Sequence, residues 1–185
     1  MNLKKTRTIV TGGSRGIGFD IAKRLSKAGS RVSILDIVPP NTNLSVLNKK
    51  LKGEVKYVKC DLSKTKEIKL FFEKTKNNYK EFTILINNAR YKTNSELYEN
   101  SSDWNKSISI GLSAPFLVSQ EVIKYSKMGG SIINICSIAS KLVTHQSPSY
   151  HVVKGGLLSL NRYLAVKAGP KNFTVNAILP GLIIQ

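Results

Sequence analysis

The sequence predicts a doubly wound α/β fold, in which a parallel sheet carries helices on both faces. Short stretches rich in isoleucine, valine and leucine alternate with longer stretches whose apolar residues recur at helical spacing. Several of the short stretches are apolar on both faces, as are strands that are buried from both sides. Because right-handed crossovers join such strands, the ligand crevice is expected at their carboxyl ends.

The first half of the chain opens with a short apolar strand at residues 8–10, which runs into a glycine-rich turn. A helix is predicted over residues 17–28 because its apolar residues share one face and Gly29 is a typical stop. The polar, turn-rich segment 39–48 is expected to form a surface connection. The other predicted elements of this half are strands at 31–36 and 55–61 and a helix at 64–79.

The second half continues the same alternation. Predicted strands lie at 82–87, 130–136 and 173–179, and predicted helices lie at 103–127 and 148–168. The strands of the whole chain end at residues that are polar or form turns, namely Thr11, Asp36, Asp61, Asn87, Ser137 and Pro180. These residues are expected to gather at one edge of the sheet.

Length and composition indicate a single domain over residues 1–185, since 185 residues with 41% hydrophobic content suffice for one core. No apolar run approaches the length of a membrane span, and the N-terminal residues lack the pattern of a secretory signal. Cys60 and Cys136 lie far apart in the sequence and lack metal-ligand spacing. We therefore expect a reduced, cytoplasmic protein with no metal site.

The net charge of +18 is unusual, and no acidic residue follows Glu121. Such a balance favours polyanions, so nucleic acid is one class of partner to consider. The basic residues form no arginine-rich stripe, and no aromatic ladder is interleaved with them as in single-strand binders. A lysine-rich, solvated surface is the favoured interpretation, and nucleic-acid binding is not expected.

The segment 11–18 follows a predicted strand and opens a predicted helix, which is the context of a dinucleotide-binding turn. Glycines let the backbone approach a pyrophosphate, and a helix N-terminus offers free N–H groups and a partial positive charge. A tight turn without a ligand is the alternative. The candidate cofactor-binding residues of this segment are Gly12, Ser14, Arg15, Gly16, Ile17 and Gly18.

Asp36, at the end of the second predicted strand, bears on which dinucleotide would bind. An acidic residue about 20 positions beyond the glycine turn can hydrogen-bond both ribose hydroxyls. Its charge would also repel a 2′-phosphate. Arg15 argues the other way, because its guanidinium could pair with that phosphate. We give Asp36 more weight, so the sequence favours NAD over NADP.

Tyr150 and Lys154 stand four residues apart and share one face of a predicted helix. A lysine ammonium favours the phenolate, and so lowers the pKa of a phenol from its ordinary value near 10. Such a phenol can act as an acid or a base near neutral pH. Together with Ser137 and the glycine turn, this pair predicts transfer of a proton and a hydride between a nicotinamide cofactor and a hydroxyl or carbonyl.

The sequence resembles the short-chain dehydrogenase/reductase family along its whole length. The matching motifs, in the family's order and spacing, are residues 11–18, Asp61-Leu62, Asn87-Asn88-Ala89, residues 134–137, Tyr150 with Lys154, and residues 176–181. Each motif alone is weak, but together they identify the chain as a member of this family. The resemblance implies a Rossmann-like sheet that normally has a seventh strand and a substrate lid, and the sequence supplies six strands.

The resemblance also implies roles for individual residues. Tyr150 would be the general acid in reduction and the base in oxidation, Ser137 would hydrogen-bond the substrate oxygen, and Lys154 would hold the nicotinamide ribose. The other implied cofactor contacts are Asp61 and Leu62 at the adenine, Asn88 and Ala89 on the adenosine ribose side, and Pro180, Gly181 and Ile183 beside the nicotinamide.

The sequence departs from the family pattern at three places. The family's catalytic asparagine falls on Gly111, counted seven positions from Trp104, and glycine cannot help to hold the relay water as that asparagine does. Arg90 stands where the family has a glycine, and it either crowds the loop or points outward. The sequence ends at Gln185, before the lid and the seventh strand, so we expect a truncated member or one completed elsewhere.

The expected function is NAD(H)-dependent interconversion of a small secondary alcohol and a ketone. The alternative is a catalytically degenerate remnant that at most binds the cofactor, which the three departures favour. By analogy with the family, homo-oligomers would form through helices 103–127 and 148–168.

Overall fold

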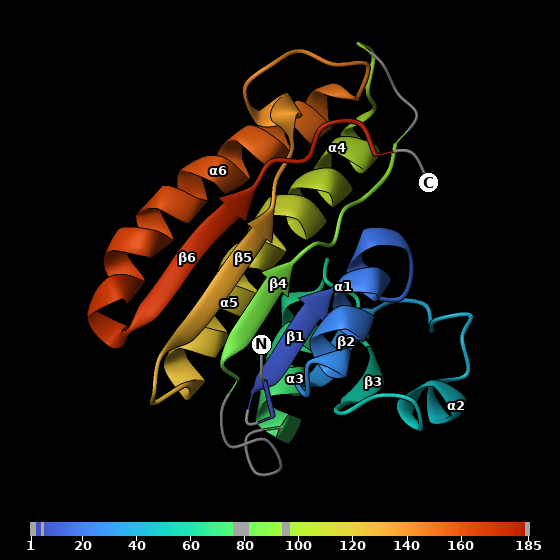
Figure 1. Ribbon diagram of the computed structural model, residues 1–185. Helices are drawn as coiled ribbons and strands as arrows, with labels where there is room; N and C mark the ends of the chain where they lie inside the picture. The colour runs from blue at the N-terminus through green and yellow to red at the C-terminus, as the bar shows by residue number, and fades with distance from the viewer. Residues whose placement is uncertain (1–2, 5, 76–81, 94–96, 184–185) are drawn as a thin grey trace.

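The computed structural model describes residues 3–4, 6–75, 82–93 and 97–183. This part of the chain forms a six-stranded, fully parallel sheet in the order β3-β2-β1-β4-β5-β6. The strands are β1 (Arg7–Thr11), β2 (Arg31–Asp36), β3 (Glu54–Lys59), β4 (Ile84–Asn87), β5 (Gly130–Ile135) and β6 (Phe173–Ile178). The doubly wound fold is confirmed, and the strand order reverses between β1 and β4 (Figure 1).

Helices cover both faces of the sheet (Figure 1). They are α1 (Gly16–Lys27), α2 (Leu44–Asn48), α3 (Thr65–Thr75), α4 (Ser101–Ile108), α5 (Ala114–Tyr125) and α6 (Pro148–Ala168). On one face, Val10 and Ile34 pack with Ala22 of α1. On the other face, Val118 of α5 and Leu164 of α6 belong to a second buried cluster with α3. Burial from both sides explains why the strands are apolar on both faces.

The helix α2 lies in the segment that the sequence predicts to be a surface connection. The side-chain oxygen of Asn43 begins it by accepting hydrogen bonds from the N–H groups of Ser45 (3.0 Å) and Val46 (3.2 Å). A helix of five residues is too short to show a helical spacing of apolar residues, so the sequence pattern does not reveal it.

The predicted helix 103–127 is interrupted in the structure. A π-helical turn, Ser109–Ser113, separates α4 from α5, and Gly111 is buried at its centre. A Cβ added to Gly111 would lie 2.5 Å from Cγ1 of Val153 in α6. The glycine therefore allows α6 to pack closely against the π-helical turn.

The remaining differences concern boundaries. The predicted strand 55–61 ends at Lys59, and the predicted strand 82–87 begins at Ile84. The predicted helix 64–79 is described as far as Thr75, and its last residues lie outside the described part of the chain. Among the described residues, no helix combines the length and the apolar character needed to span a membrane.

Candidate active site

The glycine turn connects β1 to α1. Gly12 and Gly16 have φ angles of 61° and 53°, which residues with side chains rarely adopt. A Cβ on Gly12 would lie 2.7 Å from Cα of Ala89, so only glycine lets this turn meet the loop after β4 so closely. The Asn88 side-chain amide holds the two loops together by donating hydrogen bonds to the carbonyls of Thr11 (3.1 Å) and Gly12 (2.8 Å).

The turn has the free polar groups that a pyrophosphate needs. Arg15 is the N-cap residue of α1, but its side chain makes no capping hydrogen bond, and the first turn contains no acidic residue. The Ser14 hydroxyl is buried without a hydrogen-bond partner in the described structure. Gly16 and Ile17 begin the helix, and a Cβ on Gly18 would collide with the backbone of the turn. Free helix N–H groups and an unpaired hydroxyl fit a bound phosphate.

Asp36 joins the end of β2 to the glycine turn. Its Oδ2 accepts a hydrogen bond from the N–H of Ser14 (3.1 Å), and its Oδ1 accepts one from the N–H of Ile37 (2.8 Å). Each carboxylate oxygen keeps a second lone pair, so the carboxylate can still accept hydrogen bonds from ribose hydroxyls. The structure thus places this acid beside the turn, as the sequence predicts.

Asp61 and Leu62, which follow β3, differ in accessibility. The Asp61 carboxylate accepts hydrogen bonds from the N–H (3.0 Å) and the hydroxyl (2.7 Å) of Ser63, and it lies 3.4 Å from Nζ of Lys64. The Leu62 side chain is 6% exposed and belongs to the core cluster on the α3 face. Any contact between Leu62 and an adenine would therefore come from its backbone.

Tyr150 and Lys154 lie in the first turns of α6. Nζ of Lys154 is 5.6 Å from the centroid of the Tyr150 ring, and it donates a hydrogen bond of 2.6 Å to the carbonyl of Ile135 at the end of β5. The predicted pair is thus brought together and fixed to the sheet. The Tyr150 ring is half-buried.

Lys154 is a buried cation, with 3% of its surface exposed. Burial lowers the pKa of its ammonium to about 8, the Cys136 thiol opposes this effect, and Arg90 adds to it. Burial also raises the pKa of the Cys136 thiol. The ammonium therefore relies on the Ile135 carbonyl for stabilisation.

Ser137 and the segment after β6 lie side by side. The Ser137 hydroxyl oxygen accepts a hydrogen bond from the N–H of Ala139 (3.2 Å), which leaves its own proton free to donate. The carbonyl of Pro180 accepts a hydrogen bond from the N–H of Ile138 (3.1 Å). Gly181 and Ile183 follow at the surface, and Ile183 is 48% exposed.

Arg90 turns toward the predicted catalytic tyrosine. Its Cζ lies 5.8 Å from the centroid of the Tyr150 ring. Among the described non-glycine residues, only Asn172 has a positive φ, so Arg90 occupies the family's glycine position without backbone strain. The side chain therefore lies over the site instead of pointing away from it.

Glu99 is a residue near the site that the sequence analysis missed. Its two carboxylate oxygens accept hydrogen bonds from the N–H (2.8 Å) and the hydroxyl (2.7 Å) of Ser149, one residue before Tyr150. This contact ties the segment before α4 to the first turn of α6. Fifty positions separate the two residues, and neither belongs to a recognised motif, so no local pattern signals the pair.

A chain of three amide side chains, two of them buried, links the elements around the site. The Asn87 side chain donates a hydrogen bond of 2.8 Å to that of Asn134, which in turn donates one of 2.9 Å to that of Asn161. These contacts join β4, β5 and α6. Asn87 and Asn134 therefore serve to hold the elements that carry the candidate catalytic residues.

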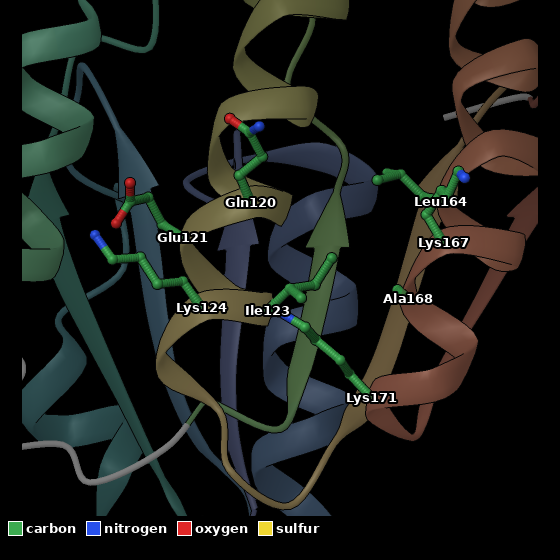
Figure 2. Close-up of a pocket in the computed structure, with 8 residues that line it drawn as sticks. All are labelled: Gln120, Glu121, Ile123, Lys124, Leu164, Lys167, Ala168 and Lys171. Carbon is green, nitrogen blue, oxygen red and sulfur yellow. The ribbon is translucent and has the colours of Figure 1, made fainter.

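A groove elsewhere on the molecule lies between α5 and α6 (Figure 2). It is lined by Gln120, Glu121, Ile123, Lys124, Leu164, Lys167, Ala168 and Lys171. Lys167 lies about 25 Å along the axis of α6 from Tyr150, from the helical rise per residue. The groove is therefore separate from the candidate active site.

Comparison with known proteins agrees with this arrangement. The sequence pattern of the short chain dehydrogenase family matches residues 6–184. A probable galactose dehydrogenase from Rhizobium meliloti is 30% identical to this chain over 190 residues, which cover 99% of this chain and 73% of that protein.

Two solved structures share both fold and sequence similarity with the chain. A short chain dehydrogenase from Leptospira borgpetersenii with bound NAD+ has a TM-score of 0.89 and 26% identity, with coverage of 100% of this chain and 74% of that one. An NADPH-dependent 3-quinuclidinone reductase from Rhodotorula rubra has a TM-score of 0.88 and 26% identity, with coverage of 98% and 71%. The chain belongs to the short-chain dehydrogenase/reductase family, whose members are oxidoreductases that act on small molecules with a nicotinamide cofactor.

Proposed function

We propose that the chain interconverts a secondary alcohol and a ketone, with NAD(H) as cofactor and Tyr150 as acid and base. The observation that carries this proposal is the buried Lys154 ammonium, 5.6 Å from the centroid of the Tyr150 ring. A cation fixed at this distance by its hydrogen bond to Ile135 stabilises negative charge on the phenol oxygen. That arrangement suits a group that must both give and take a proton.

In the proposed reaction, Tyr150 and Ser137 both act on the substrate oxygen. In reduction, Tyr150 donates its phenolic proton to the carbonyl oxygen, and in oxidation the phenolate takes the hydroxyl proton. The Ser137 hydroxyl donates a hydrogen bond to the same oxygen, and the remaining N–H groups of Lys154 hold a ribose hydroxyl. A bound nicotinamide supplies the hydride to the carbonyl carbon, or accepts it in the reverse direction.

NAD is the proposed cofactor because Asp36 stands at the end of β2, beside the glycine turn. Its carboxylate suits the two hydroxyls of an unmodified ribose and opposes a 2′-phosphate. Arg15 is an exposed cation at the start of α1 and favours the opposite choice. Among similar proteins, one depends on NADPH and another binds NAD+. The choice between NAD and NADP therefore depends on whether Asp36 or Arg15 lies nearer the 2′ position of the adenosine ribose.

Cofactor titration followed by a ketone panel tests the proposal. NADH and NADPH are titrated separately, and NADH oxidation is then followed with small ketones. We expect tighter binding of NADH, and turnover that is lost in Tyr150→Phe. Near-normal turnover in that variant would show that the proton comes from another group.

A second candidate function is cofactor binding without turnover. The observation that favours it is the packing of Val153 against Gly111, which puts an apolar side chain where the family has an asparagine amide. Tight NADH binding with no turnover of any ketone would support this candidate. Turnover that requires Tyr150 would exclude it.

Pairing of two chains through α4, α5 and α6 remains a prediction. Tyr163 and Val166 of α6 are 56% and 72% exposed, which gives such an interface apolar contacts. Sedimentation of the wild-type chain beside Val166→Glu distinguishes a dimer that depends on this surface from a monomer.

A further inference from the structure

Two cations approach the same phenol ring from different elements. Nζ of Lys154 lies 5.6 Å and Cζ of Arg90 lies 5.8 Å from the centroid of the Tyr150 ring. Lys154 is buried and hydrogen-bonded to the Ile135 carbonyl. Arg90 is exposed, so its guanidinium can meet a molecule that enters from solvent.

Arg90 also has no carboxylate partner among the described residues. The ion pairs found there involve lysines of α1, β3 and the start of α3. Glu99, which lies near the start of α6, already accepts two hydrogen bonds from Ser149. The positive charge over Tyr150 is therefore not neutralised within this part of the protein.

The loop after β4 directs Arg90 toward the reacting phenol. Ala89 donates a hydrogen bond of 3.2 Å to the Thr11 hydroxyl, and the Asn88 amide binds the carbonyls of the glycine turn. These contacts fix the backbone immediately before Arg90. Its side chain then extends over the ring of Tyr150, whose hydroxyl is proposed to act on the substrate oxygen.

We infer that Arg90 selects a substrate that carries a negatively charged group, a carboxylate or a phosphate, close to its reacting carbonyl. The inference rests on the oxidoreductase function proposed above and adds the class of substrate. The planar guanidinium presents paired N–H donors that match a carboxylate or a phosphate, and a lysine lacks this geometry. A ketone whose oxygen contacts Tyr150 places a nearby carboxylate or phosphate within reach of the Arg90 guanidinium.

Matched ketones test the inference. The probes are pyruvate, acetoacetate and levulinate, each paired with its methyl ester, so that the spacing between carbonyl and carboxylate grows by one methylene at a time. Their dissociation constants are measured by calorimetry on the wild-type chain saturated with NAD+. The oxidised cofactor cannot reduce a ketone, so binding is read without turnover. The same titrations are repeated without cofactor.

The wild-type chain should bind at least one keto acid about tenfold more tightly than its ester, as expected for a charge-assisted contact. Arg90→Gln should remove most of this preference, and Arg90→Lys should retain part of it. Arg24→Gln, which removes an exposed arginine of α1, should leave it unchanged. NADH affinity is measured for each variant, because the cofactor pyrophosphate is the other anion that Arg90 could hold.

Three results would overturn the inference. The first is equal affinity of the wild-type chain for each acid and its ester. The second is no detectable binding of any of the six compounds. The third is an Arg90→Gln variant that loses affinity for NADH but keeps the preference for the acid. If the inference is right but the proposed reaction is wrong, the result is different. The chain then still binds the acid more tightly than the ester, but it reduces no ketone.

Discussion

Val153 occupies the space beside Gly111, where an added Cβ would lie 2.5 Å from the Val153 Cγ1 atom. Val153 directly precedes Lys154 in α6, and Gly111 lies in the π-helical turn between α4 and α5. By the resemblance to the family, an asparagine side chain at position 111 would help to hold the relay water. In the structure it would first meet Val153.

Gly111→Asn alone should therefore destabilise the protein, by about 1–3 kcal/mol for an overpacked position. The β-branched Val153 side chain has little rotamer freedom in a helix and cannot easily move aside. Gly111→Asn combined with Val153→Ala should recover much of this loss. Urea denaturation of both variants beside Val153→Ala measures the coupling. Additive effects would mean that the two positions do not compete for space.

The variant that combines Gly111→Asn with Val153→Ala also tests whether position 111 affects turnover. If an amide at position 111 holds a water near Lys154, the double variant should turn over faster than Val153→Ala, with unchanged NADH affinity. Steady-state rates with a reactive ketone give the comparison. Equal rates would indicate that water already reaches Lys154 unaided.

The cofactor preference should depend on Asp36. Asp36→Ala should narrow the difference between NADH and NADPH affinity, because it removes the charge that opposes a 2′-phosphate. Asp36→Asn separates the effect of the charge from that of the hydrogen bond. It loses the charge but keeps an oxygen that can accept a hydrogen bond from the Ser14 N–H. Fluorescence titration measures both affinities. Equal binding of the two cofactors by the wild-type chain would contradict the assignment.

Substitutions of Tyr150 and Lys154 should differ in their effects on NADH affinity. Tyr150→Phe keeps the ring but removes the transferable proton, so turnover should fall by about 10² or more. Its NADH affinity should stay close to that of the wild-type chain. Lys154→Ala should weaken NADH binding as well as turnover, because it removes a proposed ribose contact. Loss of NADH affinity in Tyr150→Phe would argue for a structural role of the hydroxyl.

Lys154 should contribute a rise in the stability of the cofactor-free protein with pH in alkaline solution, whereas the raised pKa values of the buried Cys60 and Cys136 thiols act in the opposite direction. Burial lowers the pKa of Lys154 to about 8, from an ordinary value of 10.5, so the unfolded chain binds more protons between these pH values. The cost of burying the ammonium is therefore present below pH 8 and is relieved as the pH rises.

Lys154→Met should remove this rise, which amounts to at most about 3 kcal/mol. Urea denaturation from pH 7 to 10.5 tests it, with Lys27→Met at an exposed position of α1 as the control. Identical pH slopes in wild type and Lys154→Met would show that the ammonium is not buried in solution.

Glu99 should act as a positioning residue for Tyr150. Glu99→Gln removes the charge that accepts the N–H and hydroxyl of Ser149, and should lower the stability by about 1–2 kcal/mol. Thermal unfolding and kcat are both measured, with Glu121→Gln in α5 as the control. A drop in stability without any change in kcat or KM would leave the contact with a purely structural role.

Local patterns in the sequence predict most of the fold. Strand alternation, the glycine turn and the bounds of α6 depend on short-range preferences, and the structure reproduces helix 148–168 residue for residue. The carboxyl-end rule also places Asp36, Asn87 and Ser137 at the same edge of the sheet. These features need only backbone periodicity and topology.

The contacts that refine the site depend on tertiary packing. The position of Arg90 over Tyr150 is set by hydrogen bonds that Ala89 and Asn88 donate to Thr11 and the glycine turn, far away in the sequence. The Glu99–Ser149 contact joins residues 50 positions apart. The close packing of α6 against Gly111 in the π-helical turn is likewise a tertiary contact, which no local propensity encodes.

The order of the sheet has a consequence for synthesis. β1 is made first, yet it lies between β2 and β4, with Thr8 to Val10 aligned to residues 84–86. A nascent chain that has emerged through β3 can assemble β1, β2 and β3, but one edge of β1 stays unpaired until β4 leaves the ribosome. A translational pause between β3 and β4 would prolong the exposure of that apolar edge, when pairing with another chain competes with folding.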